Sequence, residues 1–200
     1  MSDRKTLDVY AAKAEEYQAL VGSDAPDADL QRFIDALPAG ARVLDIGCGP
    51  GMAAGFMAAA GHAAEAWDPV AEMRALAAAR PGVTTRVAGY DDLTARAAYD
   101  GIWANFSMLH TPLARWETQF AAVHDALVPA GLFHFGTKLG TGEVRDSIGR
   151  MYSYMEETPL RDLFARSGFA IEFARTGEEA GLSGEVAPFI VILARKAADV

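Results

Sequence analysis

The fold is decided by the stretch Val43-Leu44-Asp45-Ile46-Gly47-Cys48-Gly49-Pro50-Gly51. It begins with a short, mostly apolar run, which is typical of a buried strand in a parallel sheet. Three glycines at alternate positions follow, and the alanine-rich segment 52–60 favours a helix that packs closely on a sheet. The stretch therefore predicts a strand, a tight glycine turn and a helix, whose free N–H groups and positive dipole end face a ligand.

The glycine turn distinguishes between two classes of cofactor. A dinucleotide-binding turn has the pattern G-x-G-x-x-G, and counting from Gly47 its third glycine position holds Met52 instead. The carboxylate of Asp45 precedes the turn, where it suits a cationic group better than a pyrophosphate. With its Asp-x-Gly-x-Gly-x-Gly pattern, the stretch resembles the first motif of class I S-adenosylmethionine-dependent methyltransferases.

This resemblance covers residues 40–195 and implies an α/β fold. The expected architecture is a Rossmann-like, seven-stranded, mostly parallel sheet with an antiparallel last strand and helices on both faces. Strand and helix patterns alternate along the chain, which is typical of the same fold class. We expect a single methyltransferase domain over residues 1–200, divided into an N-terminal helical cover (1–39), a cofactor-binding half (40–137) and an acceptor-side loop with the C-terminal half (138–200).

The remaining periodicity predicts the elements around this unit. Apolar residues at helical spacing favour one helix over 6–21 and a second over 27–37. Tyr10 and Tyr17 on the first helix could face the cofactor, since many family members have such a covering helix, or could pack as half-buried residues. Further helices are expected over 70–79, 112–128 and 158–166, and further strands over 63–67, 83–88, 99–104, 132–137, 169–175 and 188–194.

The resemblance also assigns cofactor-binding roles near the ends of the first four strands. The glycine turn would lie against the methionine part of S-adenosylmethionine, with Asp45 near its amino group. Asp68 ends the second strand, nineteen residues after Gly49, where a carboxylate can accept both ribose hydroxyls or simply cap the next helix. The residues expected to bind the cofactor, or its product S-adenosylhomocysteine, are Asp45, Gly47, Cys48, Gly49, Gly51, Asp68, Pro69, Met73, Tyr90, Asp91 and Asn105.

Some of these residues have simpler interpretations. Met73 could pack on the adenine face or belong to the core. Tyr90 or Asp91 could contact the adenine, whereas Asp91 and its neighbour Asp92 could merely cap a short helix. Cys48 is the single cysteine of the chain, which excludes an intrachain disulfide, and we expect it to be a small buried filler rather than a nucleophile.

The acceptor is expected beyond the end of the fourth strand, where open parallel sheets place their ligands. His110 follows this strand and titrates near neutrality, so it is the candidate general base, although it could equally cap a helix or fix the loop. The segment 138–157 is rich in aromatic residues and methionine, which favours a lid or acceptor pocket over packing onto the core. The candidate substrate-binding residues are His110, Arg145, Tyr152 and Tyr154.

Composition restricts the class of partner. The chain has 18 Lys and Arg against 27 Asp and Glu, and its formal net charge of −9 is poorly matched to a phosphate backbone. We therefore expect no nucleic-acid partner. No signal peptide is visible and no apolar stretch is long enough for a bilayer, which favours a cytoplasmic protein without a membrane partner. The fourth and fifth strands lack clustered carboxylates, so no metal is expected.

We therefore expect an S-adenosylmethionine-dependent methyltransferase that acts on an unidentified small-molecule acceptor. In the expected in-line displacement, an O, N, S or C atom of the acceptor attacks the methyl carbon as the sulfur leaves. Four alternatives stay open: a non-catalytic S-adenosylmethionine-binding protein, a dinucleotide-dependent oxidoreductase, an interaction protein that uses the fold as a scaffold, and a nucleic-acid or protein methyltransferase. The sequence determines neither the acceptor nor the oligomeric state.

Overall fold

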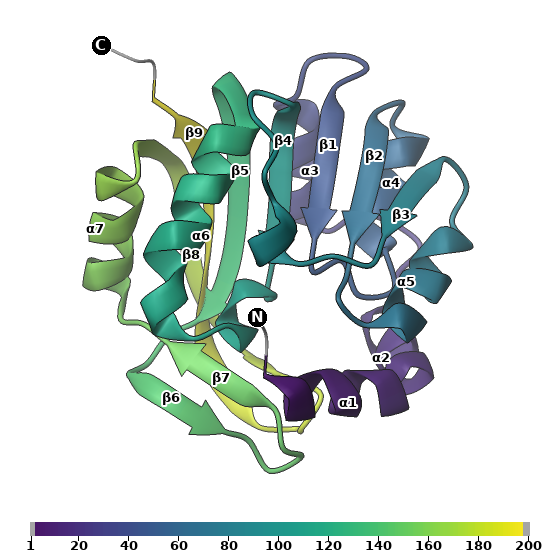
Figure 1. Ribbon diagram of the computed structural model, residues 1–200, viewed down its shortest axis with the longest axis vertical. Coiled ribbons are helices and arrows are strands. Elements are labelled where there is room, and N and C mark those ends of the chain that lie inside the picture. The colour runs from purple at the N-terminus through teal and green to yellow at the C-terminus, as the bar shows by residue number, and fades with distance from the viewer. Residues whose placement is uncertain (1–2, 198–200) are drawn as a thin grey trace.

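In the computed structural model, which describes residues 3–197, the run Val43–Ile46 lies in β1, an inner strand of a seven-stranded sheet (Figure 1). The strand order is β3-β2-β1-β4-β5-β9-β8. The strands from β3 to β5 pair in parallel, and β9 is antiparallel to both of its neighbours, which confirms the expected fold. The sheet strands are β1 (Arg42–Ile46), β2 (Ala63–Trp67), β3 (Val83–Arg86), β4 (Tyr99–Asn105), β5 (Leu127–Lys138), β8 (Phe169–Ala180) and β9 (Val186–Lys196).

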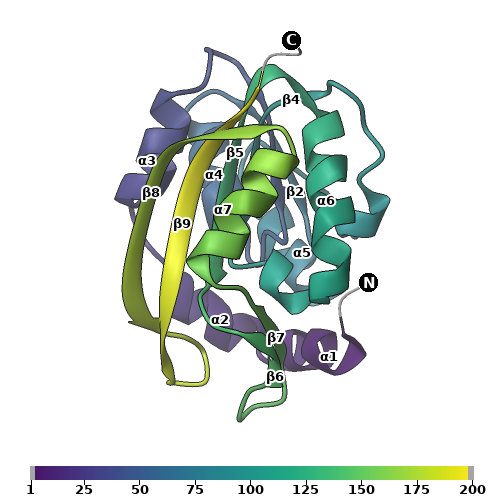
Figure 2. The ribbon, with the colours of Figure 1, turned by 90° about the vertical axis from the view of Figure 1, so that its left-hand side faces the viewer.

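Helices cover both faces of this sheet, because the strands are apolar on both sides. One buried cluster joins α3 (Ala28–Asp35), α4 (Met52–Ala59) and α5 (Ala71–Ala78) to the sheet. A larger cluster joins α6 (Leu113–Ala126) and α7 (Glu157–Arg166) to the opposite face. Figure 2 shows α6 and α7 on one side of the sheet and α3 on the other.

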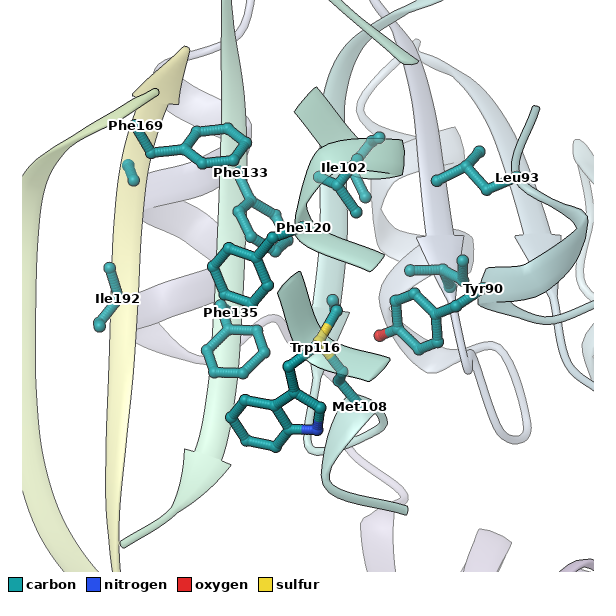
Figure 3. Packing of buried hydrophobic residues seen from close by; sticks show 14 of the residues in the cluster. Tyr90, Leu93, Ile102, Met108, Trp116, Phe120, Phe133, Phe135, Phe169 and Ile192 are labelled. Carbon is teal, nitrogen blue, oxygen red and sulfur yellow. The ribbon is translucent and has the colours of Figure 1, made fainter. Parts of the chain in front are cut away.

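Aromatic rings fill the core beneath α6 (Figure 3). Phe120 lies edge-on to Phe133 and Phe135 of β5, with ring centroids 5.5 and 5.4 Å apart. Trp116 meets Phe135 in the same way at 5.7 Å. Such edge-to-face pairs add a directional preference to the burial of large apolar surfaces, so they fix the position of α6 on the sheet.

The strand order reverses between β1 and β4, and this switch point defines where a ligand fits. The loops after β1 and β4 leave the sheet in opposite directions, which opens a crevice at its carboxyl edge. The short helices α1 (Arg4–Ala12) and α2 (Ala14–Val21) lie across this edge, and the arrowheads of β1 and β2 point toward them in Figure 1. Two 3-10 turns, η1 (Tyr90–Asp92) and η2 (Met108–His110), follow β3 and β4 at the same edge.

The structure corrects three expectations about secondary structure. The helix expected over 6–21 is interrupted at Lys13, whose φ of −114° and ψ of +20° are not helical, so α1 ends there and α2 begins at Ala14. The segment 138–157 is not a plain loop, since β6 (Gly142–Arg145) and β7 (Met151–Tyr154) pair antiparallel within it. The last two strands are longer than 169–175 and 188–194, because they keep pairing to Ala180 and Val186. No helix among residues 3–197 is both long and apolar enough to cross a bilayer.

Candidate functional site

A cavity of about 510 Å³ lies at the switch point, beneath α1 and α2. This volume falls within the range of roughly 300–1,000 Å³ that small-molecule sites occupy. Most residues expected to bind a ligand line it: Asp45, Gly47, Cys48, Gly49, Asp68, Pro69, Met73, Tyr90, Asn105, His110 and Tyr152. Gly51, Asp91, Arg145 and Tyr154 do not line it. The carboxyl edge of the sheet therefore brings together residues from the whole length of the chain.

The glycine turn forms one wall of the cavity with its backbone. Gly47 and Gly49 have φ values of +71° and +52°, which L-residues with a Cβ rarely adopt. A Cβ at Gly47 would overlap the side chain of Ser107, so the loop after β4 packs directly on the turn. A Cβ at Gly49 would lie 3.3 Å from the ring of Tyr17 and would fill the space between turn and ring. Glycine at these two positions therefore lets Ser107 and Tyr17 approach the turn closely.

Gly51 has a different structural reason to be glycine. Its φ is +72°, and a Cβ there would lie 2.6 Å from the Cβ of Ala77 in α5. The residue therefore lets α4 start close to α5. Its predicted contact with the cofactor stays a prediction.

Asp68 connects the glycine turn to the start of the next helix. Its Oδ2 atom accepts a hydrogen bond from the Gly49 N–H at 2.8 Å, and its Oδ1 atom accepts one from the Val70 N–H at 2.8 Å. Burial raises the pKa of this carboxyl to about 6, and both hydrogen bonds oppose the rise. A carboxylate has about four lone-pair sites, so two remain for further donors such as a pair of ribose hydroxyls.

Asp45 is a second buried carboxyl at the same edge. Its Oδ2 atom accepts a hydrogen bond from the Ala54 N–H at 3.2 Å, which ties the end of β1 to α4. Burial raises its pKa to about 7, and the nearby charge of Asp68 adds to the rise. A ligand ammonium group would compensate this charge, which makes the position suitable for a cation.

The region after β3 places Tyr90 inside the cavity and Asp91 outside it. The Ser107 hydroxyl donates to the Ile46 carbonyl oxygen at 2.8 Å, so it accepts from the Tyr90 hydroxyl at 2.7 Å. Tyr90 is thereby held against the loop after β4. The Asp91 carboxylate accepts from Arg115 of α6 at 2.7 Å, and this ion pair holds it away from the cavity lining.

Asn105 is oriented by the strand beside it. Its Oδ1 atom accepts a hydrogen bond from His134 Nε2 at 3.1 Å. The His134 ring is stacked on Trp103 with centroids 3.5 Å apart, and burial lowers its pKa to about 3, so the ring is neutral. A Cβ at Gly136 would overlap the Asn105 side chain. His134 is thus structural, and it fixes a side chain that lines the cavity.

His110 has no free ring nitrogen. Its Nδ1 atom lies 2.7 Å from the Met151 carbonyl oxygen, so Nδ1 carries the proton and donates. Its Nε2 atom then accepts from the Tyr10 hydroxyl at 2.8 Å. Burial lowers the pKa of the imidazole to about 4, so the ring is neutral at pH 7. The Tyr10 hydroxyl in turn accepts from Arg150 Nη1 at 2.8 Å, which completes a chain of three side chains.

The β6–β7 hairpin is bonded to α1, and together they cover the end of the cavity beside His110. The Met151 N–H donates to the Thr6 hydroxyl at 2.8 Å, and Thr6 is fully buried. Arg145 donates to both carboxylate oxygens of Asp3, at 2.8 and 3.1 Å. Tyr154 stacks against Tyr152, with centroids 5.8 Å apart. Arg145 and Tyr154 therefore support the cover, and their predicted substrate contacts stay predictions.

Several cavity residues were not predicted from the sequence. Lys138 ends β5, directly after the predicted strand 132–137, so the rule that ligands gather at strand ends was a signal for it. A further group lies on the last hairpin of the sheet. Its members are Arg175, Phe189 and Val191, which fall within the predicted strands, and Glu179, Gly181 and Leu182, which fall beyond them, where the sequence pattern did not indicate that β8 and β9 extend. Among residues 3–197, no three His, Cys, Asp or Glu side chains lie close enough together to hold a metal ion.

A family model described as a methyltransferase domain matches residues 17–177 of this chain. No curated protein matches the sequence significantly. Several solved structures share the fold. The 1,6-didemethyltoxoflavin-N1-methyltransferase of Burkholderia thailandensis, bound to 1,6-didemethyltoxoflavin and S-adenosylhomocysteine, is 22% identical with a TM-score of 0.71, over 95% of this chain and 88% of that one.

Two further structures resemble the chain at lower identity. An S-adenosylmethionine-dependent methyltransferase of Methanosarcina mazei has a TM-score of 0.74 and 19% identity, over 87% of this chain and 99% of that one. The [4+2]-cyclase SpnF has a TM-score of 0.74 and 14% identity, over 100% of this chain and 98% of that one. At such identities the likeness shows the fold alone, and the cyclase illustrates that this fold does not fix a reaction.

Proposed function

The chain belongs to the class I S-adenosylmethionine-dependent methyltransferases, and we propose that it transfers the methyl group of S-adenosylmethionine to a small-molecule acceptor. The observation that carries the proposal is Asp68, a buried carboxylate with spare lone pairs, bonded to a glycine turn at the switch point of the sheet. When bound, S-adenosylmethionine supplies a methyl group that its sulfonium centre has already activated.

The residues of the cavity fit the parts of this cofactor. The backbone of Gly47 and Gly49, which lines the cavity, would contact the methionine part, and Asp45 would bind its ammonium group. Asp68 would accept the ribose hydroxyls. Pro69 and Met73, which follow β2, and Tyr90, which follows β3, line the cavity and would contact the adenine. The raised pKa values of both carboxyls agree with this fit, because each carboxyl lacks the donors that a ligand would bring.

The protein's own contribution is to position the acceptor and exclude water. An activated methyl donor needs mainly alignment with the attacking atom, so a covered cavity is the feature that the chemistry requires. The covering elements are α1 and the β6–β7 hairpin, joined by the hydrogen bond between Thr6 and Met151. His110 would act as a base only through Tyr10, whose hydroxyl donates to its Nε2 atom. An acceptor proton would pass to the Tyr10 oxygen as the hydroxyl proton moves to His110.

A small acceptor is favoured over a macromolecule on two grounds. The cavity of about 510 Å³ must hold both the cofactor and the acceptor, and the net charge of −9 disfavours nucleic acid. The Burkholderia thailandensis structure, which holds a small molecule together with S-adenosylhomocysteine, offers a parallel in a protein of the same fold.

Calorimetric titration with S-adenosylhomocysteine tests the cofactor assignment. We expect a Kd near 1 μM for the wild type, about −8 kcal/mol. Asp68→Ala should weaken binding by a factor of about 100 or more, because two hydrogen bonds to a charged acceptor are lost. Asp100→Ala is the matched control, since Asp100 accepts from the Arg42 N–H at the opposite end of β4. It should change the Kd by less than about threefold, because Asp100 does not line the cavity.

Transfer is then measured with S-adenosylmethionine labelled in its methyl group, supplied with a mixture of small-molecule acceptors. Label in a small molecule, lost in Asp68→Ala, is the expected result. Tight binding without any transfer would instead favour a non-catalytic S-adenosylmethionine-binding protein. If the protein binds neither S-adenosylmethionine nor S-adenosylhomocysteine, the proposal is overturned.

A further inference from the structure

We propose that Lys138 and Arg150 form a carboxylate-binding site at the acceptor end of the cavity, and that the methyl acceptor is a small carboxylic acid with an apolar, planar body. This inference rests on the proposed function and specifies its substrate class. It is carried by two buried cations: Lys138, which has no hydrogen-bond or ion-pair partner among the described residues, and Arg150, in which one nitrogen makes no hydrogen bond to them.

Lys138 is the first of these cations. The residue is 7% exposed and lies at the end of β5, in the cavity lining. Its ammonium group forms no hydrogen bond and no ion pair with any residue in 3–197. It lies 5.5 Å from the centre of the Tyr152 ring, which gives a partial compensation only. The carboxylates that act on it through space are Glu179, Asp146 and Glu185, and burial lowers its pKa.

Arg150 is the second cation, and one of its donors is unused. The residue is 2% exposed, and its guanidinium lies between the rings of Tyr10 and Tyr152, at 5.3 and 5.0 Å from their centres. Its Nε atom donates to Asp146 at 2.9 Å and its Nη1 atom donates to Tyr10 at 2.8 Å. Its Nη2 atom lies 2.8 Å from Asp146, but no N–H direction fits, so this buried nitrogen donates no hydrogen bond.

The two nitrogens converge on one part of the cavity wall. A Cβ at Gly181 would lie 3.1 Å from Lys138 Nζ and 4.0 Å from Arg150 Nη2. Gly181 lines the cavity, so both donors approach the space that a ligand enters. A carboxylate accepts two donors at once and would satisfy both nitrogens. The charge of Arg150 is already balanced by Asp146, and a ligand carboxylate would balance that of Lys138.

The surrounding wall indicates the body of the acceptor. Phe106 and Phe189 meet edge to face with ring centroids 5.8 Å apart, and both line the cavity with Leu109 and Tyr152. Phe106 has a φ of +51°, a conformation that costs energy for a residue with a Cβ. Flat apolar walls of this kind suit a planar molecule, because rings pack on each other by offset or edge contacts.

The carboxylate could also belong to the methionine part of the cofactor, and the experiment separates these two sources. The probes are benzoate and benzamide, and the larger pair 2-naphthoate and 2-naphthamide, titrated into the protein saturated with S-adenosylhomocysteine. In each pair the shape is nearly constant and only the acid is anionic. We expect each acid to bind at least ten times more tightly than its amide.

Three variants assign the preference to the site. Lys138→Met should abolish the preference for the acid and leave the S-adenosylhomocysteine affinity within twofold. Lys138→Arg should retain the preference, since it keeps the cation. Lys13→Met removes the same charge from an exposed ion pair with Glu16 outside the cavity lining, and it should behave like the wild type.

Thermal unfolding tests independently whether Lys138 serves stability. A methionine at position 138 removes a buried cation without a partner, so Lys138→Met should have a Tm equal to or above that of the wild type. A large loss of Tm would mean that Lys138 serves stability, and it would overturn the inference.

These measurements distinguish a failure of the proposed function from a failure of the carboxylate-binding site. If S-adenosylhomocysteine does not bind the wild type, the proposed function itself fails. If it binds but acids and amides bind equally, only the carboxylate site is wrong. If Lys138→Met weakens S-adenosylhomocysteine more than tenfold, the carboxylate is that of the cofactor, and the acceptor assignment is overturned.

Discussion

The end of the cavity that we assign to the cofactor (the cofactor end) is built from groups close together in the sequence, whereas the end that we assign to the acceptor (the acceptor end) joins segments that are far apart. Gly49 and Asp68, which are hydrogen-bonded, are 19 residues apart. At the other end, Tyr10 is bonded to His110 and Arg150, at separations of 100 and 140 residues. The first region depends on one strand–turn–helix unit and its neighbour, and the second depends on the whole chain having folded.

The chemistry of the two ends differs as well. The cofactor end presents backbone groups held by glycines with positive φ, and two carboxyls. The acceptor end presents aromatic rings and two cations on α1, β5 and β7 or beside them. A cofactor that many proteins share needs the same binding residues in each of them, whereas each acceptor needs different ones. Because the two ends are separate, residues at the acceptor end can change without altering the glycine turn.

The largest effect that we expect concerns the close approach at the glycine turn. Gly47→Ala should lower the free energy of unfolding by roughly 2–5 kcal/mol, because it adds a left-handed conformational cost and an overlap with Ser107. Gly40→Ala is the matched control, since its φ of +69° is similar but nothing lies within 4 Å of its Cβ. It should cost about 1 kcal/mol. Equal losses in urea unfolding would show that backbone conformation alone matters at the turn.

At the acceptor end, Tyr10→Phe tests how much the hydrogen bonds between distant segments contribute to the unfolding free energy. The change leaves His110 Nε2 and a guanidinium donor of Arg150 without partners, which should cost roughly 1–3 kcal/mol of unfolding free energy. Tyr99→Phe removes one bond to Glu65 outside the cavity and should cost less than about 1 kcal/mol. The comparison is contradicted if Tyr99→Phe is the more damaging variant.

The pH dependence of the cofactor end should show two opposite trends. By the proposed function, the ionised forms of Asp45 and Asp68 would accept hydrogen bonds from the ligand, and their pKa values are about 7 and about 6. The affinity for S-adenosylhomocysteine should therefore be full at pH 8 and fall as the pH drops, approaching about tenfold per pH unit for each group once the pH is below its pKa. Calorimetry with Asp68→Asn should show a shallower fall.

Without ligand, the same groups destabilise the folded protein as they ionise. Their pKa values are raised above the ordinary 3.8, so the folded state holds these protons more tightly than the unfolded chain. The unfolding free energy of the ligand-free protein should gain from these groups at low pH and lose that gain as the pH rises from about 4 to 7. If the contribution of Asp45 to the unfolding free energy instead rises over this pH range, its carboxyl is not buried as described.

The smallest effect is expected for Arg145→Ala at the rim of the cover. The ion pair with Asp3 lies at the surface, with side chains 32% and 30% exposed, so solvent screens it and its loss should change the unfolding free energy little. Thermal unfolding measures this, with Arg161→Ala as the control for another exposed ion pair. An increase in the acceptor KM of Arg145→Ala would support the substrate role predicted from the sequence.

The parts that the sequence determined are those coded by short-range patterns. The run from Val43 to Gly51 predicted the β1–turn–α4 unit. An apolar run favours a buried strand, and alternate glycines allow the positive φ values of a tight turn, so both patterns act locally on the backbone. Asp68 was identified by its distance along the chain from that turn. The alternation of strands and helices predicted the sheet, since parallel strands require crossover helices of limited length.

Only the tertiary structure decided the acceptor end. Nothing local to Tyr10, His110 or Arg150 specifies that they form one chain of hydrogen bonds, since each bond requires segments that meet only when the sheet is complete. The same holds for the unused donor of Arg150 and the unpaired Lys138, because the absence of a partner is a property of the folded environment. The sequence shows which residues are charged, but only their burial in the folded protein determines which of them lack a partner.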